Sequence, residues 1–387
     1  MKYLVVSDIH LGHNKTKTEH IIKNLKKHVF NDSNKDVDVI FIAGDLFDRL
    51  LDLNEEDVIL IMDFLKYMLA YCSLNDILLR VLEGTPSHDW FQPRIILNIN
   101  NMLSKKADLK YIRTIDIEYI ERIKKYVLYI PDEWSNDHNE LENQIKELLV
   151  KNSITNVDIA ILHGQFKYQI LNKKYKGFYF KEEYFLNLVK GYIHVGHYHT
   201  HSSFDRIIAQ GSFDRLSHGE EEPKGYVKVI DDKWYFIENP DSYKYVTIDL
   251  DKIKSIDELD KKIRKLPKNS YIRFKTSSKT KYDINELKIR YIDYNISKKD
   301  INETITQTEY KNYMLDLDSI DLNIKNYISP NDILKELKDH FLTNDKDQDD
   351  IKIYEKYINK YKDFIKDETE ENTYMNYDKS HEEIKDE

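Results

Sequence analysis

Short apolar runs alternate with amphipathic stretches along the first 230 residues of the chain. Apolar, β-branched runs occupy residues 2–6, 37–43, 77–82, 157–162 and 191–195, and polar residues follow each of them. Between the runs, residues 19–30 and 55–71 space their apolar positions by three and four, as amphipathic helices do. The pattern predicts an α/β fold of layered sheets and helices, in which functional residues collect at the carboxyl ends of strands.

The pattern changes after about residue 240. Residues 245–250, 269–275 and 287–292 are expected to be strands, and Ser255 with Glu258 forms a capping box that begins a helix ending near Pro267. These elements predict a small βαββ unit. All ten glycines lie at or before Gly225, which places a domain boundary near residues 235–245.

Two short amphipathic helices are expected between residues 329 and 366. Their apolar faces must be buried either on their own domain or against a helix of a partner, and the sequence leaves both possibilities open. Residues 367–387 hold nine acids and two lysines, which is typical of a solvated tail. The whole chain has a net charge of −10, of which −3 remains on the first 366 residues, so the charge does not exclude a local groove for DNA.

Length and composition exclude several classes of protein. A chain of 387 residues predicts two or three domains, and 41% hydrophobic with 33% charged residues excludes wholesale disorder, collagen and coiled-coil rods. No apolar stretch approaches about 18 residues, and the first apolar run meets Asp8 too early for a signal peptide, so we expect a cytoplasmic protein. Cys72 is the only cysteine, which excludes an internal disulfide and leaves His, Asp, Glu or Asn to hold any metal ion.

Each of the five apolar runs ends in residues of metal-binding type. In chain order these are Asp8 and His10, then Asp45 and Asp48, then His88 and Asp89, then His163, and finally His197 and His199. One such pair alone would more often be a hydrogen-bonded loop, but five sets at strand ends indicate a shared site. Imidazoles and carboxylates suit manganese, iron or zinc, and a carboxylate can bridge two ions. Two ions about 3.5–4 Å apart are the usual apparatus for in-line attack on a phosphate ester.

The segments around these residues resemble the calcineurin-like metallophosphoesterase superfamily. They read DIHLG from residue 8, GDLFD from residue 44, SHD from residue 87, HGQ from residue 163 and GHYH from residue 196. The most specific similarity is to the SbcD-type DNA repair nucleases, including phage recombination endonuclease subunits, because residues 211–215 and 219–226 resemble a segment that follows the last histidine motif there. The similarity covers residues 1–230 by motif and continues to about 365 only as matching architecture.

The resemblance implies a layered αββα metallophosphoesterase core over residues 1–238 and a small α+β capping domain over residues 239–328. Partner-binding helices at 329–366 would dock on an ATPase, and residues 367–387 would form a disordered acidic tail. The implied activity is that of a DNA exonuclease or endonuclease with two divalent metal ions, for which manganese is expected. The implied partners are double-stranded DNA and an SbcC-type coiled-coil ATPase, with a homodimer of this chain inside a heterotetramer and no membrane contact.

Carried over residue by residue, the resemblance implies two ions bridged by Asp45. The ligands of the first ion would be Asp8, His10, Asp45 and His199. The ligands of the second ion would be Asp45, His163 and His197.

The resemblance also implies roles for residues that do not bind the ions. His88 would orient the substrate or protonate the leaving oxygen, as an imidazole near neutral pKa can. Asp48 and Asp89 would orient ligating or catalytic imidazoles. Simple capping of turns remains an alternative for both carboxylates.

The third motif departs from the family pattern. The family usually has Gly-Asn-His-Asp, with the asparagine on the second ion, whereas this chain has Gly84-Thr-Pro-Ser-His88-Asp89. Ser87 stands where the amide is expected, so its hydroxyl or a water would fill that position. We therefore expect weaker occupancy of the second metal site.

Two other classes of function stay open. The first is a phosphatase or phosphodiesterase of the same superfamily that acts on a substrate other than DNA, which would have no use for residues 240–366 as interpreted here. The second is a scaffold that kept the fold and lost its metal ions, against which the retention of nearly every ligand argues.

Overall fold

The computed structural model of the chain describes residues 1–300 except 53, 133–136, 171–176 and 278–279. The chain divides into two units at residue 303, and the described residues belong to the first unit. The segments at 329–366 and 367–387, for which we predicted helices and an acidic tail, lie outside the described residues.

Two six-stranded sheets form the centre of the large domain. The first sheet contains, in spatial order, β12 (Lys233–Glu238), β11 (Gly225–Ile230), β1 (Lys2–Val6), β2 (Val39–Ala43), β3 (Leu78–Leu82) and β4 (Leu109–Ile112). The second contains β5 (Asp116–Ile120), β6 (Lys125–Ile130), β7 (Ile159–His163), β8 (Ile193–Gly196), β10 (Ile207–Ala209) and β9 (Ser202–Phe204). Strands β1 to β4 are mutually parallel, as are β6, β7, β8 and β10.

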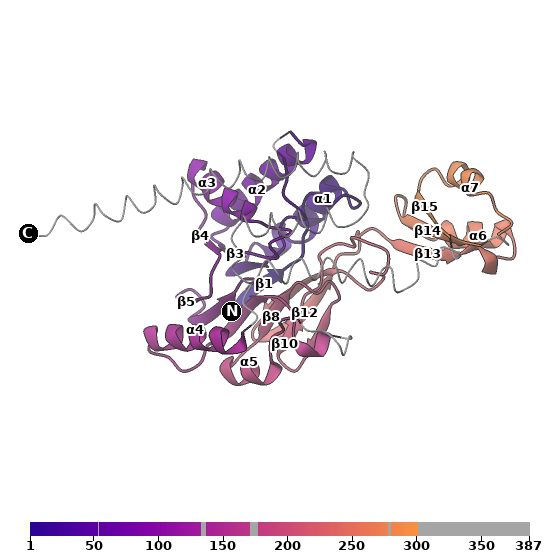
Figure 1. Cartoon of the computed structure of the whole chain (residues 1–387). Helices are drawn as coiled ribbons and strands as arrows, with labels where there is room; N and C mark the ends of the chain where they lie inside the picture. Colours follow the sequence, from indigo (N-terminus) through magenta and orange to yellow (C-terminus); the bar gives the residue numbers. More distant parts are fainter. Residues whose placement is uncertain (53, 133–136, 171–176, 278–279, 301–387) are drawn as a thin grey trace, which may run out of the picture. The chain divides into compact units, whose positions relative to one another are not determined.

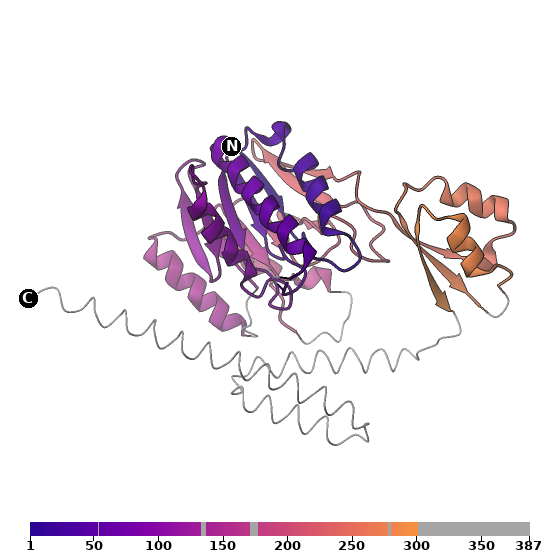
Figure 2. The same cartoon turned by 90° about the horizontal axis from the view of Figure 1, so that it is seen from above.

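Helices cover the outer face of each sheet. The first sheet carries α1 (Thr18–His28), α2 (Glu56–Leu74) and α3 (Ile95–Met102), and the second carries α4 (His138–Lys151) and α5 (Glu182–Leu188). Figure 1 shows the two helical layers on opposite sides of the sheets, and α1 and α2 lie across the first sheet in Figure 2. The expected layered α/β architecture is therefore confirmed.

The alternation of side chains along β1 explains why its whole sequence is apolar. Leu4 and Val6 pack outward against the helices, while Tyr3 and Val5 pack inward between the sheets, because successive residues of a strand face opposite sides. A strand with both faces buried reads as a continuous apolar run. That property made the central strands visible in the sequence.

A buried histidine lies in the layer between the two sheets. His194 in β8 has no exposed surface, and the hydroxyl of Tyr3 lies 3.1 Å from its Nε2. The side-chain amide of Gln210 donates a hydrogen bond of 2.9 Å to its Nδ1. These two contacts suit a neutral imidazole with its proton on Nε2.

The small domain is a three-stranded parallel sheet with two helices. It consists of β13 (Tyr245–Asp249), α6 (Ile256–Ile263), β14 (Tyr271–Thr276), α7 (Ile284–Arg290) and β15 (Asn295–Asp300), drawn in orange tones in Figure 2. Half of the expected capping box at the start of α6 is present, since the hydroxyl of Ser255 accepts from the amide of Glu258. The Glu258 carboxylate accepts from the amide of Lys254 and not from that of Ser255.

One predicted strand of the small domain is a helix. Residues 287–292 were expected to be extended, but α7 covers most of them and the third strand follows at β15. Asp283 caps this helix by accepting from the amide of Asn285, and Leu287 and Tyr291 are buried at a spacing of four. Capping and one buried face outweigh the preference of isoleucine and tyrosine for strands.

Asp214 connects the two domains at their boundary. Its buried carboxylate accepts hydrogen bonds from Asn24 in α1, from Ser242 and from the amide of Tyr243. Burial alone would raise the pKa of Asp214, but hydrogen bonds from His20 and its other neighbours lower the pKa below its usual value. Two residues of the expected boundary segment 235–245, Ser242 and Tyr243, are thus held by a charged side chain that precedes it in the chain.

Among the helices of the described residues, none has the length and apolar character needed to cross a membrane.

His194 should make the large domain less stable at low pH. Burial lowers the pKa of His194 to about 3, whereas an imidazole in the unfolded chain titrates near pH 6.5. Between these values the unfolded state binds a proton that the folded state refuses, so the free energy of unfolding decreases as the pH falls. From pH 7 to pH 5 we expect a loss of about 2 kcal/mol from this group.

Urea unfolding of the metal-free wild type and His194→Gln at both pH values measures this loss. Tryptophan fluorescence follows the large domain, because all three tryptophans precede residue 238. The free energy of unfolding should depend less on pH in the variant, by about 2 kcal/mol over this interval. An equal loss of unfolding free energy in the wild type and in His194→Gln would show that His194 does not cause the pH dependence.

Candidate metal centre

The candidate metal-binding side chains lie where the carboxyl ends of both sheets meet. Asp8 and His10 follow β1, Asp45 follows β2, His163 ends β7, and His197 and His199 follow β8. Three groups of these side chains bring ligand atoms within 4.8 Å of one another, and the groups are Asp8 with His10 and His199, Asp45 with His163 and His197, and His10 with Asp45 and His88. The structure therefore brings together six of the seven residues expected to bind metal ions, and the seventh, Ser87, belongs to none of these groups of histidines and aspartates.

The backbone around these residues turns sharply. Asp8, His10 and Asp45 have φ values of 50° to 54°, in the left-handed region that residues other than glycine seldom adopt. A loop carries Asp8 and His10, because β1 ends at Val6. Such conformations cost free energy and are typical of functional sites.

Two glycines allow the loops to approach one another. Gly44 has φ +84°, and a Cβ atom there would lie 2.1 Å from Nδ1 of His163. A Cβ atom on Gly84 would lie 2.1 Å from the backbone nitrogen of Asp45. Neither position has room for a side chain, so glycine is needed at both.

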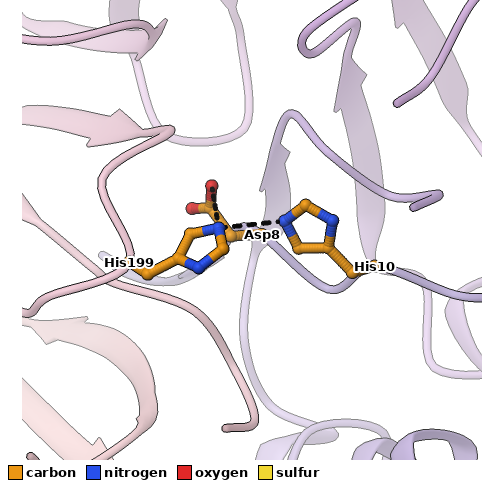
Figure 3. A group of neighbouring side chains, drawn as sticks. All are labelled: Asp8, His10 and His199. Carbon is orange, nitrogen blue, oxygen red and sulfur yellow. Dashed lines mark hydrogen bonds and ion pairs between the residues drawn. The ribbon is translucent and has the colours of Figure 1, made fainter. Parts of the chain in front are cut away.

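The first group contains Asp8, His10 and His199 (Figure 3). Nε2 of His10 lies 3.1 Å from Nε2 of His199, and the latter atom lies 4.0 Å from Oδ1 of Asp8. Oδ1 of Asp8 accepts from the amide of His197 at 2.8 Å, while its Oδ2 is buried and has no hydrogen-bond partner within the described part of the chain. A buried carboxylate oxygen of this kind is available to a cation.

The outer nitrogens of these two imidazoles face carboxylates. Nδ1 of His10 lies 3.1 Å from Oδ1 of Asp48, and Nδ1 of His199 donates to Oε1 of Glu220 at 3.1 Å. When both Nδ1 atoms carry the proton, the two Nε2 atoms, which are 3.1 Å apart, turn lone pairs toward each other. Two such lone pairs repel unless a cation lies between them, so this group suits a divalent metal ion.

The second group contains Asp45, His163 and His197. Nδ1–H of His163 donates to the carbonyl oxygen of Ala43 at 2.8 Å, and its Nε2 lies 3.2 Å from Oδ1 of Asp45. Burial and the positive charge that His163 can carry lower the pKa of His197 to about 4, so this imidazole is neutral at pH 7 and can bind a metal ion.

Asp45 belongs to both halves of the centre. Its Oδ1 faces His163, and its Oδ2 lies 3.8 Å from Nε2 of His10. Burial alone would raise the pKa of Asp45, but His163, His10 and His88 lower it far below its usual value. The carboxylate therefore keeps its negative charge and lies where one group could bridge two cations.

His88 lies beside the first group, and its nitrogens are not part of the pair of Nε2 atoms formed by His10 and His199. Its ring is perpendicular to that of His10 at 4.7 Å between centroids, and its Nδ1–H donates to the carbonyl oxygen of Asp48 at 2.6 Å. The hydrogen bond fixes the ring and leaves Nε2 for another partner. This placement is compatible with the role in substrate binding or proton transfer that the resemblance implies.

The two other predicted carboxylates play different parts. Asp48 faces Nδ1 of His10, in line with the expected orientation of an imidazole. Asp89 is fully buried and accepts from the amides of Phe47 and Gly84, at 2.9 and 2.7 Å. Asp89 thus joins the loops after β2 and β3, which corresponds to the turn-capping alternative.

Sequence analysis missed Glu220 and Lys224. Glu220 accepts from Nδ1 of His199, and the buried Lys224 lies 3.2 Å from Glu220 and donates to the carbonyl oxygen of His199 at 2.8 Å. Burial would raise the pKa of Glu220, but His199 and Lys224 lower it to about 2. The segment 219–226 was recognisable as unusual, yet nothing in it indicated which of three successive glutamates meets the histidine.

A family model and several solved structures match parts of the chain. The family model of calcineurin-like phosphoesterases matches residues 1–202, and no curated protein matches the chain. A solved structure described as TT1561 of Thermus thermophilus is 13% identical, with a TM-score of 0.37, and the match covers 62% of this chain and 98% of that one. Another crystal structure is 11% identical with a TM-score of 0.38, and that match covers 61% of this chain and 98% of the other.

The family match spans more than half of the chain and contains each strand end that carries a candidate ligand. This family hydrolyses phosphoesters with divalent metal ions, and the ligand groups of this chain fit such ions in residue type, burial and spacing. The chain therefore belongs to the calcineurin-like phosphoesterase family.

Proposed function

We propose that the chain is the nuclease subunit of a DNA repair or recombination complex and cleaves DNA phosphodiesters with the help of an SbcC-type coiled-coil ATPase. The observation that supports the chemistry is the sharing of Asp45 between two groups of possible metal-binding side chains, one with His10 and His88 and the other with His163 and His197. Two metal sites that share a carboxylate suit the stabilisation of both the attacking and the leaving oxygen in an in-line displacement at phosphorus.

The side chains have separate tasks in this proposal. Two divalent ions, with manganese expected, would supply Lewis acidity and an activated water when bound. Asp45, His163 and His199 would hold them, and the hydrogen bonds of the outer nitrogens keep the inner nitrogens of the two imidazoles free for that purpose. His88 would donate a proton from Nε2 to the departing sugar oxygen while its Nδ1–H stays on the carbonyl of Asp48.

Charge distribution favours DNA over a small substrate. Residues 239–300 contain sixteen lysines and arginines and ten acids, a net charge of +6 in a chain whose total is −10. A basic domain attracts the phosphates of a nucleic acid. The segment 211–226 supports the same proposal, because it resembles a segment of the SbcD-type nucleases and its Glu220 accepts a hydrogen bond from His199 at the metal centre.

DNA cleavage should require Asp8. Incubation of linear double-stranded DNA with the purified chain and manganese should degrade the DNA, and Asp8→Asn should lower the rate about a hundredfold or more, because the first ion loses a charged ligand. Asp205→Asn is the matched control, since Asp205 has the same left-handed conformation (φ 52°) on the surface and should keep wild-type activity.

Parallel assays separate this proposal from the phosphatase alternative. Hydrolysis of nitrophenyl phosphate with DNA left intact, even with the ATPase and ATP present, would select a phosphatase. Equal DNA cleavage by the wild type and Asp8→Asn would point to a contaminating nuclease and reject the assignment.

His88 should matter for cleavage and not for metal binding. His88→Ala should reduce the cleavage rate by about 10²- to 10⁴-fold, which is the usual contribution of a general acid. A manganese titration by calorimetry should give the same affinities as the wild type. His28→Ala serves as the control, because His28 in α1 forms an ion pair with Asp241 and is not part of the metal centre. Wild-type cleavage by His88→Ala would remove His88 from the mechanism.

The C-terminal segment should bind the ATPase. Deletion of residues 329–387 should leave weak manganese-dependent cleavage by the large domain and abolish co-purification with the ATPase, because the apolar faces expected at 329–366 suit a partner helix. Deletion of 367–387 alone is the control and should keep binding. Association of the longer truncation with the ATPase would refute the docking role.

A further inference from the structure

We propose that Thr85 is a ligand of the second metal ion, with its hydroxyl oxygen completing the set of Asp45, His163 and His197. The proposal rests on the metal centre of the proposed function but not on DNA as the substrate. It replaces the expectation that Ser87 or a water fills this position.

The position of the hydroxyl carries the argument. Oγ1 of Thr85 lies 3.2 Å from Nε2 of His163, 3.2 Å from Nδ1 of His197 and 3.3 Å from Oδ2 of Asp45. Ligand atoms bound at 2.0–2.2 Å around one ion lie about 3 to 3.5 Å from their neighbours. The hydroxyl oxygen therefore lies at the spacing of neighbouring ligands from one atom of each residue in the second group.

When His163 is neutral, hydrogen bonds alone do not satisfy this cluster. A hydroxyl has one proton, so Thr85 can donate to only one of its three neighbours. His163 already uses Nδ1–H on the carbonyl of Ala43, so its Nε2 presents a lone pair whenever the ring is neutral, as a metal ligand must be. A cation at the centre would satisfy every lone pair that faces it.

The backbone holds Thr85 firmly in this place. Its amide donates to Oδ1 of Asp45 at 2.6 Å, and its carbonyl oxygen accepts from the amides of His88 and Asp89, each at 2.9 Å. The preceding Gly84 donates its amide to Asp89 at 2.7 Å. The hydroxyl is thus preorganised, as a metal ligand needs to be.

Ser87 does not share this placement. Its side chain is exposed, whereas Thr85 is half-buried. Counted forward from Gly84, Thr85 is the residue directly after the glycine, where the family pattern has asparagine, and Pro86 and Ser87 are then the additional residues. Counting backward from His88 had pointed to Ser87 instead.

A manganese titration by calorimetry tests the assignment in the full-length chain, without reference to activity. Thr85→Val keeps the shape of the side chain and removes the oxygen, and should weaken the second, lower-affinity site about tenfold or more while the first site is unchanged. Thr85→Ser should bind like the wild type, and Thr85→Asn should bind the second ion at least as tightly. Ser87→Ala should bind both ions as the wild type does.

Several outcomes would overturn the inference. These are a single bound ion in the wild type, two ions bound by Thr85→Val with wild-type affinities, or a weakened second site in Ser87→Ala. Thermal unfolding of each variant shows whether the fold is kept. If Thr85→Val unfolds, a manganese-loaded crystal structure of the wild type decides, because an oxygen-to-metal distance well beyond about 2.2 Å would show that Thr85 only positions Asp45.

The test is independent of the proposed substrate. A protein with a Thr85-dependent second site that leaves DNA intact would reject the nuclease proposal and keep this one. DNA cleavage by a protein whose second metal site does not depend on Thr85 would keep the nuclease proposal and reject this one.

Discussion

A buried negative charge governs the arrangement of the large domain. Asp45 is 1% exposed, and a carboxylate removed from water costs several kcal/mol unless partners compensate it. The compensation comes from the amide of Thr85 and from imidazoles carried by both sheets. The two sheets must therefore meet with their carboxyl ends around this one side chain, and the sharp turns after β1 and β2 follow from that requirement.

Two imidazoles of the metal centre are oriented in the same way. In His163 and His199 the outer nitrogen donates to a fixed acceptor, which is the carbonyl of Ala43 in one case and the carboxylate of Glu220 in the other. The inner nitrogen is thereby left as an acceptor aimed at the centre. The selectivity of the site for cations is built into these outer contacts, and the buried Lys224 supports one of them by holding Glu220 in place.

Much of the centre could be predicted from the sequence because parallel strands gather their carboxyl ends at one edge. The central strands are buried on both faces and so read as apolar runs, and the polar residues directly after them were visible without a structure. Glu220 and Thr85 were missed for a physical reason. Their roles depend on contacts with residues 21 and 112 positions away, such as those to His199 and His197, and local pattern does not encode which side chain of a loop arrives there.

The error in the small domain, where a strand was expected in place of α7, has a related cause. The residues of α7 include isoleucines that favour strands, and the capping by Asp283 that decides for a helix is a weaker signal than the apolar run. Peripheral strands such as β9 and β10 have only three residues each, too few to show a period. Short elements are determined by what they pack against.

The two glycines without room for a side chain also limit how this centre can change over time. No substitution at Gly44 or Gly84 can adjust the distance between the loops, because a single added carbon would collide with His163 or with the backbone of Asp45. The stretch from Pro86 to Ser87, by contrast, is partly exposed and tolerates added length. Changes in the length of this loop should therefore accumulate in this short stretch, beside an otherwise rigid frame.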